Sequence, residues 1–348
     1  MVNDMKELHF TRTNGSVDED IDKLIESVGE VDQPDLVREM VLAALKAGQE
    51  KNDRAHMKLM NTTMKEMRFT GKMFGPYSNV RKVTVFGSAR TEPNEPIYKL
   101  ASDFGRRLAN SGYMIITGAG GGIMHAANEG AGVESSFGVN IQLPFEQKPN
   151  PVLAGNPKLI TYKYFFNRKV AFLKEADAVA LFPGGFGTLD EAMETLTLLQ
   201  TGKHMPLPLV LIDEPGGTYW ERWIHFFKDE LLSGNYISEC DFELFRRVNS
   251  IDEAFNIIHQ FYSCYHSMRY VRDKLVIRLT NAKQPSAIEK LNEMFADILM
   301  PGGKIFASDP LPEESDEPEV AHLPRLVMDF NMMDFGKLKT LIDEINNC

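Results

Sequence analysis

The feature that most restricts the fold of this chain is an alternation of short apolar runs with helical segments from Arg81 onward. The runs KVTVF, YMIIT and AVALF are almost uninterrupted by polar residues, and glycines follow each of them closely. Such runs indicate strands that are buried on both faces, as in a parallel sheet covered by helices. The pattern therefore predicts a doubly wound α/β domain with a parallel sheet.

The segments on either side of this alternation predict two further parts. The first 74 residues are polar, but IDKLIESV and LVREMVLAALKAG have helical spacing, so we expect an N-terminal helical extension over residues 1–74. The α/β (Rossmann-like) domain is expected over residues 75–262. From KLVIRLT onward, the order strand, helix, strand, strand, helix predicts a small α+β module over residues 270–348. Its acidic, proline-rich loop, residues 310–324, is expected to be mobile.

Composition argues against several classes of partner. The chain has 348 residues, is 43% hydrophobic and carries a formal net charge of −11, which opposes broad contact with nucleic acid. No apolar run approaches the length of a membrane span, and the N-terminus lacks the pattern of a secretory signal, so we expect no membrane partner and a cytoplasmic location. The three cysteines have no C-x-x-C spacing, so neither a disulfide framework nor a thiolate metal site is predicted.

Ligands of open parallel sheets bind beyond the carboxyl ends of the strands, and three such ends are rich in glycine. At the first, Gly87 allows a sharp turn, and the Ser88 hydroxyl can reach a sugar or a phosphate. The second is TGAGGGIM, which leads directly into a helix and offers backbone amides to an anion. The dinucleotide fingerprint G-x-G-x-x-G fails there in both registers, because its last glycine would fall on Ile123 or on His125. An NAD-linked oxidoreductase is therefore disfavoured.

The third end is PGGFGTLDE, which follows the run AVALF. Its glycines and Thr188 can hold a phosphate where the next helix begins. Asp190 and Glu191 lie in the first turns of that helix. An acidic residue at this place is ordinarily a charge that stabilises the helix, but beside a phosphate loop it is well placed for chemistry.

PGGFGTLDE, together with FFNRK at residues 165–169, resembles the signature of the LOG (Lonely guy) family. The stretches TGAGGGIMHAANEGA, VNIQLPFEQKPNP and LTLLQTGKH are also similar to longer members of that family, which is often labelled "lysine decarboxylase-like". The resemblance covers residues 80–213, in order and with plausible spacing. It agrees with the fold class predicted from the strand pattern.

The resemblance implies hydrolysis of a nucleoside 5′-monophosphate to the free base and ribose 5-phosphate, with no metal and no organic cofactor. Carried over by motif, Arg168 and Glu191 form the catalytic pair. The carboxylate would stabilise the positive charge that develops on the ribose, and the guanidinium would fix the substrate. The residues expected to bind the nucleotide are Gly87, Ser88, Gly120, Gly121, Gly122, Met124, Gly184, Gly185, Gly187 and Thr188.

Several alternatives stay open at this point. The base is undetermined, because plant-type members of the family release cytokinins, whereas longer bacterial relatives act on ordinary purine or pyrimidine monophosphates. His125 stands where many longer relatives carry an acidic residue, and either base choice or a benign helix start accounts for it. A nucleotide-binding sensor without turnover is the competing class of function. The resemblance also implies a homodimer or larger homo-oligomer.

Overall fold

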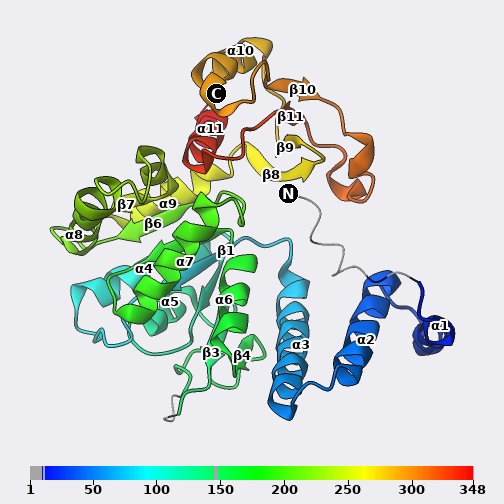
Figure 1. The fold of residues 1–348 in the computed structure, drawn as a ribbon. Coiled ribbons are helices and arrows are strands. Elements are labelled where there is room, and N and C mark those ends of the chain that lie inside the picture. Colours follow the sequence, from blue (N-terminus) through cyan, green and yellow to red (C-terminus); the bar gives the residue numbers. More distant parts are fainter. Residues whose placement is uncertain (1–9, 11, 145–147, 348) are drawn as a thin grey trace. The chain divides into compact units, whose positions relative to one another are not determined.

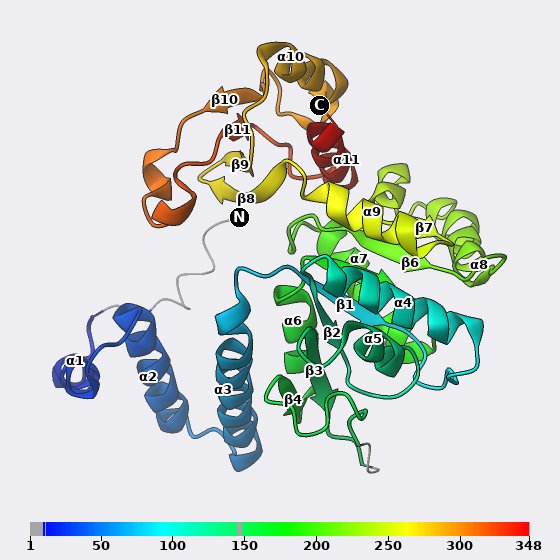
Figure 2. The ribbon, with the colours of Figure 1, turned by 180° about the vertical axis from the view of Figure 1, so that it is seen from behind.

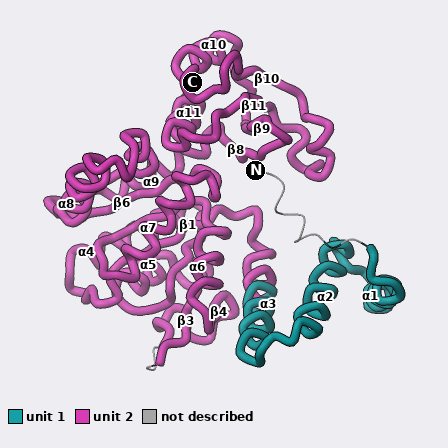
Figure 3. The backbone as a smooth tube through the Cα atoms, in the orientation of Figure 1, with its two compact units in different colours: residues 1–68 teal, residues 69–348 magenta. Residues whose placement is uncertain are grey.

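The computed structural model describes residues 10, 12–144 and 148–347. The chain divides into two compact units, residues 1–68 and residues 69–348 (Figure 3). The first unit contains helices α1 (Ser16–Val28) and α2 (Pro34–Gln49) and most of α3 (Arg54–Phe74). Within it, a buried ion pair between Asp18 and Arg38 joins α1 to α2. The predicted N-terminal helices are confirmed, while the predicted domain boundaries at residues 74 and 262 stay a prediction.

A parallel sheet forms the centre of the second unit, as the strand pattern predicts (Figure 1). Within the described residues it has seven strands, in the spatial order β4-β3-β2-β1-β5-β6-β7. In chain order these are β1 (Lys82–Phe86), β2 (Met114–Thr117), β3 (Ser136–Ile141), β4 (Leu159–Tyr162), β5 (Ala178–Leu181), β6 (Leu209–Ile212) and β7 (Arg246–Val248). The predicted α/β fold class is confirmed.

Helices cover both faces of this sheet (Figures 1 and 2). They are α4 (Pro96–Asn110), α5 (Ile123–Ala131), α6 (Phe165–Lys174), α7 (Phe186–Gln200), α8 (Tyr219–Phe226) and α9 (Ile251–Phe261). Successive side chains of a strand point to opposite faces, and β1 shows the result. Val83 and Val85 pack in one cluster with residues of α4, α5 and α9. On the other face, Thr84 donates a hydrogen bond to the Phe172 carbonyl of α6, 2.9 Å away.

The strand order reverses between β1 and β5. From β1 the chain builds outward through β2, β3 and β4, and it then returns to β5 on the other side of β1. The loops that follow β1 and β5 consequently diverge onto opposite faces of the sheet and leave a crevice between them. The fold therefore places the first and third glycine loops at the position where open α/β sheets bind ligands.

A second sheet follows, and it is antiparallel, with strands in the order β10-β11-β9-β8. Its elements are β8 (Tyr265–Val271), β9 (Lys274–Leu279), α10 (Pro285–Met294), β10 (Phe306–Ser308), β11 (Arg325–Met328) and α11 (Phe335–Asn347). Helices α10 and α11 bury one face of this sheet in a large apolar cluster that includes Leu291, Leu338 and Ile342. The predicted small α+β module is present, and β8 is a strand that the sequence pattern did not indicate.

The loop over residues 310–324 covers the other face of the second sheet. The sequence predicts that it is mobile, and the structure shows this prediction to be wrong. Glu314 is 3% exposed, and its carboxylate accepts hydrogen bonds from Arg278 of β9 and Arg325 of β11 at 2.7 and 2.9 Å. Two guanidinium groups neutralise the buried charge, so the acidic composition of the loop does not keep it in solvent.

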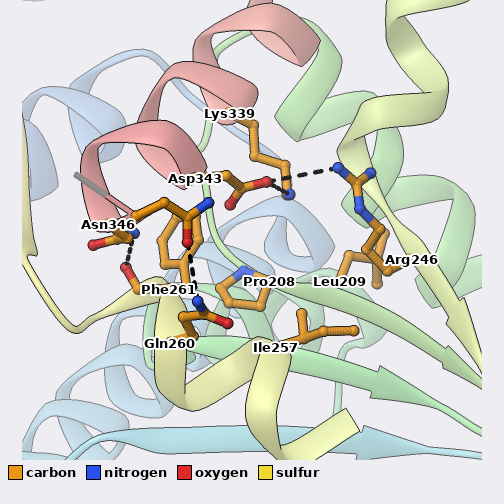
Figure 4. Close-up of a pocket in the computed structure, with 10 residues that line it drawn as sticks. Pro208, Leu209, Arg246, Ile257, Gln260, Phe261, Lys339, Asp343 and Asn346 are labelled. Carbon is orange, nitrogen blue, oxygen red and sulfur yellow. Dashed lines mark hydrogen bonds and ion pairs between the residues drawn. The ribbon is translucent and has the colours of Figure 1, made fainter. Parts of the chain in front are cut away.

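Helix α11 also packs against α7 and α9, which flank the parallel sheet, and both sheets lie in one unit. At this junction a small cavity of about 210 Å³ lies between α11, α9 and the start of β7 (Figure 4). The buried Lys339 ammonium donates a hydrogen bond to Asp343, 2.7 Å away, and the Arg246 guanidinium lies 3.6 Å from the same carboxylate. Burial lowers the pKa of Lys339. Gln260 of α9 donates a hydrogen bond to the side chain of Asn347 of α11 at 3.0 Å, and both residues line the cavity.

Candidate functional site

A cavity of about 760 Å³ lies at the carboxyl ends of β1 and β5. It is lined by Phe86, Gly87, Ser88, Ala89, Arg90, Met124, Phe165, Arg168, Gly184, Gly185, Phe186, Gly187, Thr188, Leu189, Asp190 and Glu191. The fold therefore brings together both residues of the predicted catalytic pair and most of the residues predicted to bind the nucleotide. Gly120, Gly121 and Gly122 are not in its lining.

The amino end of α7 forms one wall of this cavity. Gly185 is the N-cap residue, and no side chain caps the helix, so the Phe186 and Gly187 amides of its first turn remain available to an anion. The Thr188 amide already donates to the Gly185 carbonyl at 3.0 Å. Gly184 has no room for a side chain, because a Cβ atom there would lie 2.1 Å from the Thr188 hydroxyl oxygen and 3.0 Å from the Ser88 amide. The close approach places the Ser88 and Thr188 loops side by side, as a phosphate cradle requires.

The glycine loop after β2 packs against the Ser88 loop. Gly122 has φ of 61°, and a Cβ atom there would lie 2.1 Å from the Ser88 carbonyl oxygen. The Ile123 amide donates to the same oxygen at 2.9 Å. Asn150 holds the loop by donating to the Gly120 carbonyl at 3.1 Å. The structure thus places Gly120 to Gly122 beneath the Ser88 loop, and their predicted contact with a nucleotide stays a prediction.

Replacing Gly122 with alanine is expected to lower the free energy of unfolding by about 2–5 kcal/mol, since left-handed strain and overpacking act together. The Ser88 loop must also shift, so nucleotide affinity should fall. Gly112→Ala is the matched control, because Gly112 has φ of 84° but no neighbour within 4 Å of its Cβ position. Its cost should be the strain alone, about 1–2 kcal/mol. Urea unfolding of both variants measures the difference, and equal costs would contradict the packing argument.

Arg168 enters the cavity from α6 and is held on three sides. Its Nε atom donates to the Val139 carbonyl at 2.9 Å, and its guanidinium carbon lies 4.9 Å from the centre of the Phe172 ring. Gly118 leaves the space that the guanidinium occupies, because a Cβ atom there would lie 2.5 Å from the terminal nitrogen of Arg168. Burial lowers the pKa of Arg168, while the charge of Glu191 opposes that effect. The guanidinium is therefore oriented before any ligand arrives.

Glu191 is the buried acid of the cavity. It is 5% exposed, and burial raises its pKa to about 7, against the opposing charges of Lys169 and Arg168. Among the described residues, no donor makes a hydrogen bond to its Oε2 atom. A buried carboxylate oxygen without a hydrogen-bond donor is costly, so a reacting group, a ligand, an ion or a water molecule usually accounts for it. A carboxyl group with a pKa near neutrality can carry a proton to or from a ligand at physiological pH.

Some residues around the site were not predicted from the sequence. Arg90, Phe165 and Phe186 line the cavity, and Lys169 lies just beside Glu191. All four sit within or next to motifs that were noticed, so proximity in sequence was an available signal. His125 does not line the cavity, and its Nδ1 atom lies 3.1 Å from the Tyr98 hydroxyl.

Two features are absent from the described residues. No group of three or more His, Cys, Asp or Glu side chains is arranged there to hold a metal ion. None of the helices in the same part of the chain is at once long enough and apolar enough to cross a membrane.

Comparison with known proteins agrees with the site. Residues 121–258 match the family model described as "Possible lysine decarboxylase". The cytokinin riboside 5′-monophosphate phosphoribohydrolase LOG of Oryza sativa subsp. japonica is 26% identical over 167 residues, which is 47% of this chain and 66% of the rice protein. A pyrimidine/purine nucleotide 5′-monophosphate nucleosidase of Escherichia coli (strain K12) is 32% identical over 131 residues, covering 34% of this chain and 28% of that protein.

A further relative is cytokinin riboside 5′-monophosphate phosphoribohydrolase LOG3 of Arabidopsis thaliana, 22% identical over 54% of this chain and 86% of its own length. These matches confirm the resemblance to the LOG family that PGGFGTLDE and FFNRK indicate. The chain spans just under two thirds of the rice protein and less than a third of the Escherichia coli protein.

Proposed function

From the relationship of the α/β domain to the LOG family, we propose that this protein hydrolyses the N-glycosidic bond of a nucleoside 5′-monophosphate and releases the free base and ribose 5-phosphate. The observation that carries the proposal is the position of Glu191: a buried carboxyl group with a raised pKa, in the same cavity as the uncapped amino end of α7. A site that only bound an anion would gain nothing from a carboxylate so close to it.

The phosphate would bind at the amino end of α7, where Gly185, Gly187 and Thr188 present backbone amides and a hydroxyl group. Glu191 lies six residues after Gly185, which corresponds to about 9 Å along the helix axis. That separation suits a ribose 5-phosphate lying along α7 with its C1′ atom toward Glu191. Arg168 would fix the substrate from α6, and Met124 would border the base.

Breaking the bond to the base builds positive charge on the ribose ring. The Glu191 carboxylate would stabilise that charge and accept a proton from the attacking water. Glu191 would then pass the proton taken from water to the departing base, which regenerates the carboxylate. One water molecule is consumed, and the products are the neutral base and ribose 5-phosphate.

The pH dependence of turnover follows from the raised pKa of Glu191. Because the carboxylate is the reactive form and its pKa is raised by burial to about 7, it is mostly protonated below that pH. We expect kcat/KM to increase as the pH rises through about 7 and then to level off. Initial rates of base release between pH 5 and pH 9 measure this, and a profile flat down to pH 5 would contradict the assigned role.

We also propose that the protein is a homodimer or larger homo-oligomer, with the subunit contact beside the cavity. Exposed apolar side chains gather on α6 and at the start of α7: Phe165, Phe166 and Val170 are each about half exposed, and Phe186 is 94% exposed. Such a surface is costly in water and is typical of an interface. Sedimentation equilibrium over a range of concentrations tests it, and a monomer at every concentration would refute it.

The function is tested by incubating the protein with AMP, GMP, IMP, CMP, UMP and isopentenyladenosine monophosphate, and with the corresponding nucleosides. The proposal predicts free base from at least one monophosphate and none from its nucleoside, and the preferred monophosphate identifies the base. Binding of monophosphates without release of any base would instead favour the competing function, a nucleotide sensor.

A further inference from the structure

Lys169 is the only cation that the described residues place within 4 Å of Glu191. It follows Arg168 on α6, and its Nζ atom lies 3.5 Å from the Oε2 atom of Glu191. Oε2 is the oxygen that lacks a hydrogen-bond donor. The separation is too long for a hydrogen bond, but at such a distance the attraction in a partly buried site remains strong.

Two other carboxylates hold the lysine in this position. Nζ lies 2.9 Å from Asp190 and 2.9 Å from Glu194. These two residues are four apart on α7 and therefore lie on one face of the helix, with Glu191 beside them. Lys169 is 18% exposed, so its side chain is fixed against α7 rather than free in solvent. The ammonium group thus lies near three carboxylates: it makes close ion pairs with Asp190 and Glu194 and a longer one with Glu191.

We propose that Lys169 is a positioning residue, anchored by Asp190 and Glu194, that holds the Glu191 carboxylate in its reactive place and keeps it ionised. This inference rests on the proposed function for its catalytic meaning, but its electrostatic content concerns the folded protein alone. Asp190 and Glu194 hold the Lys169 ammonium group in place through ion pairs, and its positive charge stabilises the ionised form of Glu191.

The charges around Glu191 support this division of roles. Burial is the largest influence on Glu191 and raises its pKa; Lys169 opposes burial most strongly, Arg168 opposes it next, and Glu194 and Asp190 add to the rise. Burial also acts to lower the pKa of Lys169, but the bonds to Glu194 and Asp190 outweigh it and raise that pKa, so the ammonium stays charged. Removing Lys169 would leave Glu191 facing two like charges, with Arg168 as the remaining opposing charge.

The test compares Lys169→Met with Lys169→Arg and with the matched control Lys174→Met. Lys174 lies on the same helix, is 68% exposed and pairs with Glu175, so its replacement removes the same charge away from the cavity. The first measurement is the ionisation midpoint of Glu191, followed by carbon NMR of protein labelled at the glutamate carboxyl carbon, with Glu191→Gln identifying the signal. The second is the pH profile of kcat/KM for base release.

We expect Lys169→Met to move the Glu191 midpoint upward by about one pH unit or more, and to move the acidic limb of the rate profile with it. In Lys169→Arg, the Glu191 midpoint and the acidic limb of the rate profile should stay close to those of the wild-type protein. Lys174→Met should change neither. An unchanged midpoint in Lys169→Met would overturn the proposal, even if that variant were less stable or less active. If the wild-type protein releases no base at all, the proposed function fails, and the NMR titration still decides the role of Lys169.

Discussion

Replacing Glu191 with glutamine is expected to reduce base release by about 10³-fold or more while nucleotide binding persists. Glutamine has nearly the same shape, so the cavity and the amino end of α7 should be preserved. It cannot carry the negative charge that stabilises a cationic ribose, and it cannot accept a proton from water. The loss should therefore appear in kcat rather than in KM.

The measurement is the rate of base release from the preferred monophosphate, together with the affinity for ribose 5-phosphate by calorimetry. Glu253→Gln is a suitable control, because it removes one carboxylate from an exposed position in the first turn of α9. Both variants should bind ribose 5-phosphate like the wild-type protein. Near-normal turnover in Glu191→Gln would remove Glu191 from the mechanism.

The second large effect concerns stability. Replacing Glu314 with alanine is expected to lower the free energy of unfolding by about 3–5 kcal/mol, because Arg278 and Arg325 then remain buried without their partner. Asp316→Ala is the control in the same loop. Asp316 pairs with Arg269 but its side chain is 63% exposed, so its loss should change the free energy of unfolding far less than the loss of Glu314 does. Urea unfolding at neutral pH measures both.

The sign of the pH dependence gives a further check on Glu314. Burial raises its pKa, but hydrogen bonds from the Leu311 amide and from Arg325 and Arg278 outweigh burial, so the pKa is lowered. A carboxyl group whose pKa is lowered in the folded state stabilises the protein at pH values above the ordinary glutamate pKa. This stabilisation is lost as the pH falls through the pKa of the folded state. The wild-type advantage over Glu314→Ala should therefore shrink in acid. A constant difference at all pH values would contradict the ionised cluster.

The central strands were predictable because each is buried on both faces. Ala178–Leu181 and Leu209–Ile212 are buried throughout, so their apolar runs stand out from the surrounding sequence. The edge strands lack that signal: Leu159–Tyr162 alternates buried and exposed positions, and Arg246–Val248 has three residues with two charges. Tyr265–Val271 is buried at every third residue, so it shows neither a continuous apolar run nor a regular alternation of apolar and polar residues. This strand was therefore missed.

The site was predictable where its residues lie within one contiguous motif. PGGFGTLDE contains both the predicted phosphate-binding glycines and Glu191, and it spans one loop and the start of one helix. The spacing of residues within this motif was therefore enough to predict that they lie together. The contact of Lys169 with Glu191 joins two helices, and no local pattern indicates it. The same holds for the buried hydrogen bond from Thr117 to Asn128, which supports the loop after β2. The acidic loop was misjudged for a related reason, because its neutralising arginines lie on two separate strands.

The most direct test of the central claim follows the phosphate group of the nucleotides and the released bases together. A mixture of nucleoside 5′-monophosphates is incubated with the protein, and phosphorus NMR and chromatography of the free bases are recorded in parallel. The proposed activity predicts that a monophosphate signal is converted into that of ribose 5-phosphate, at the rate at which one equivalent of base appears. Inorganic phosphate with intact nucleoside, or no change in either spectrum or base, would contradict hydrolysis of the N-glycosidic bond.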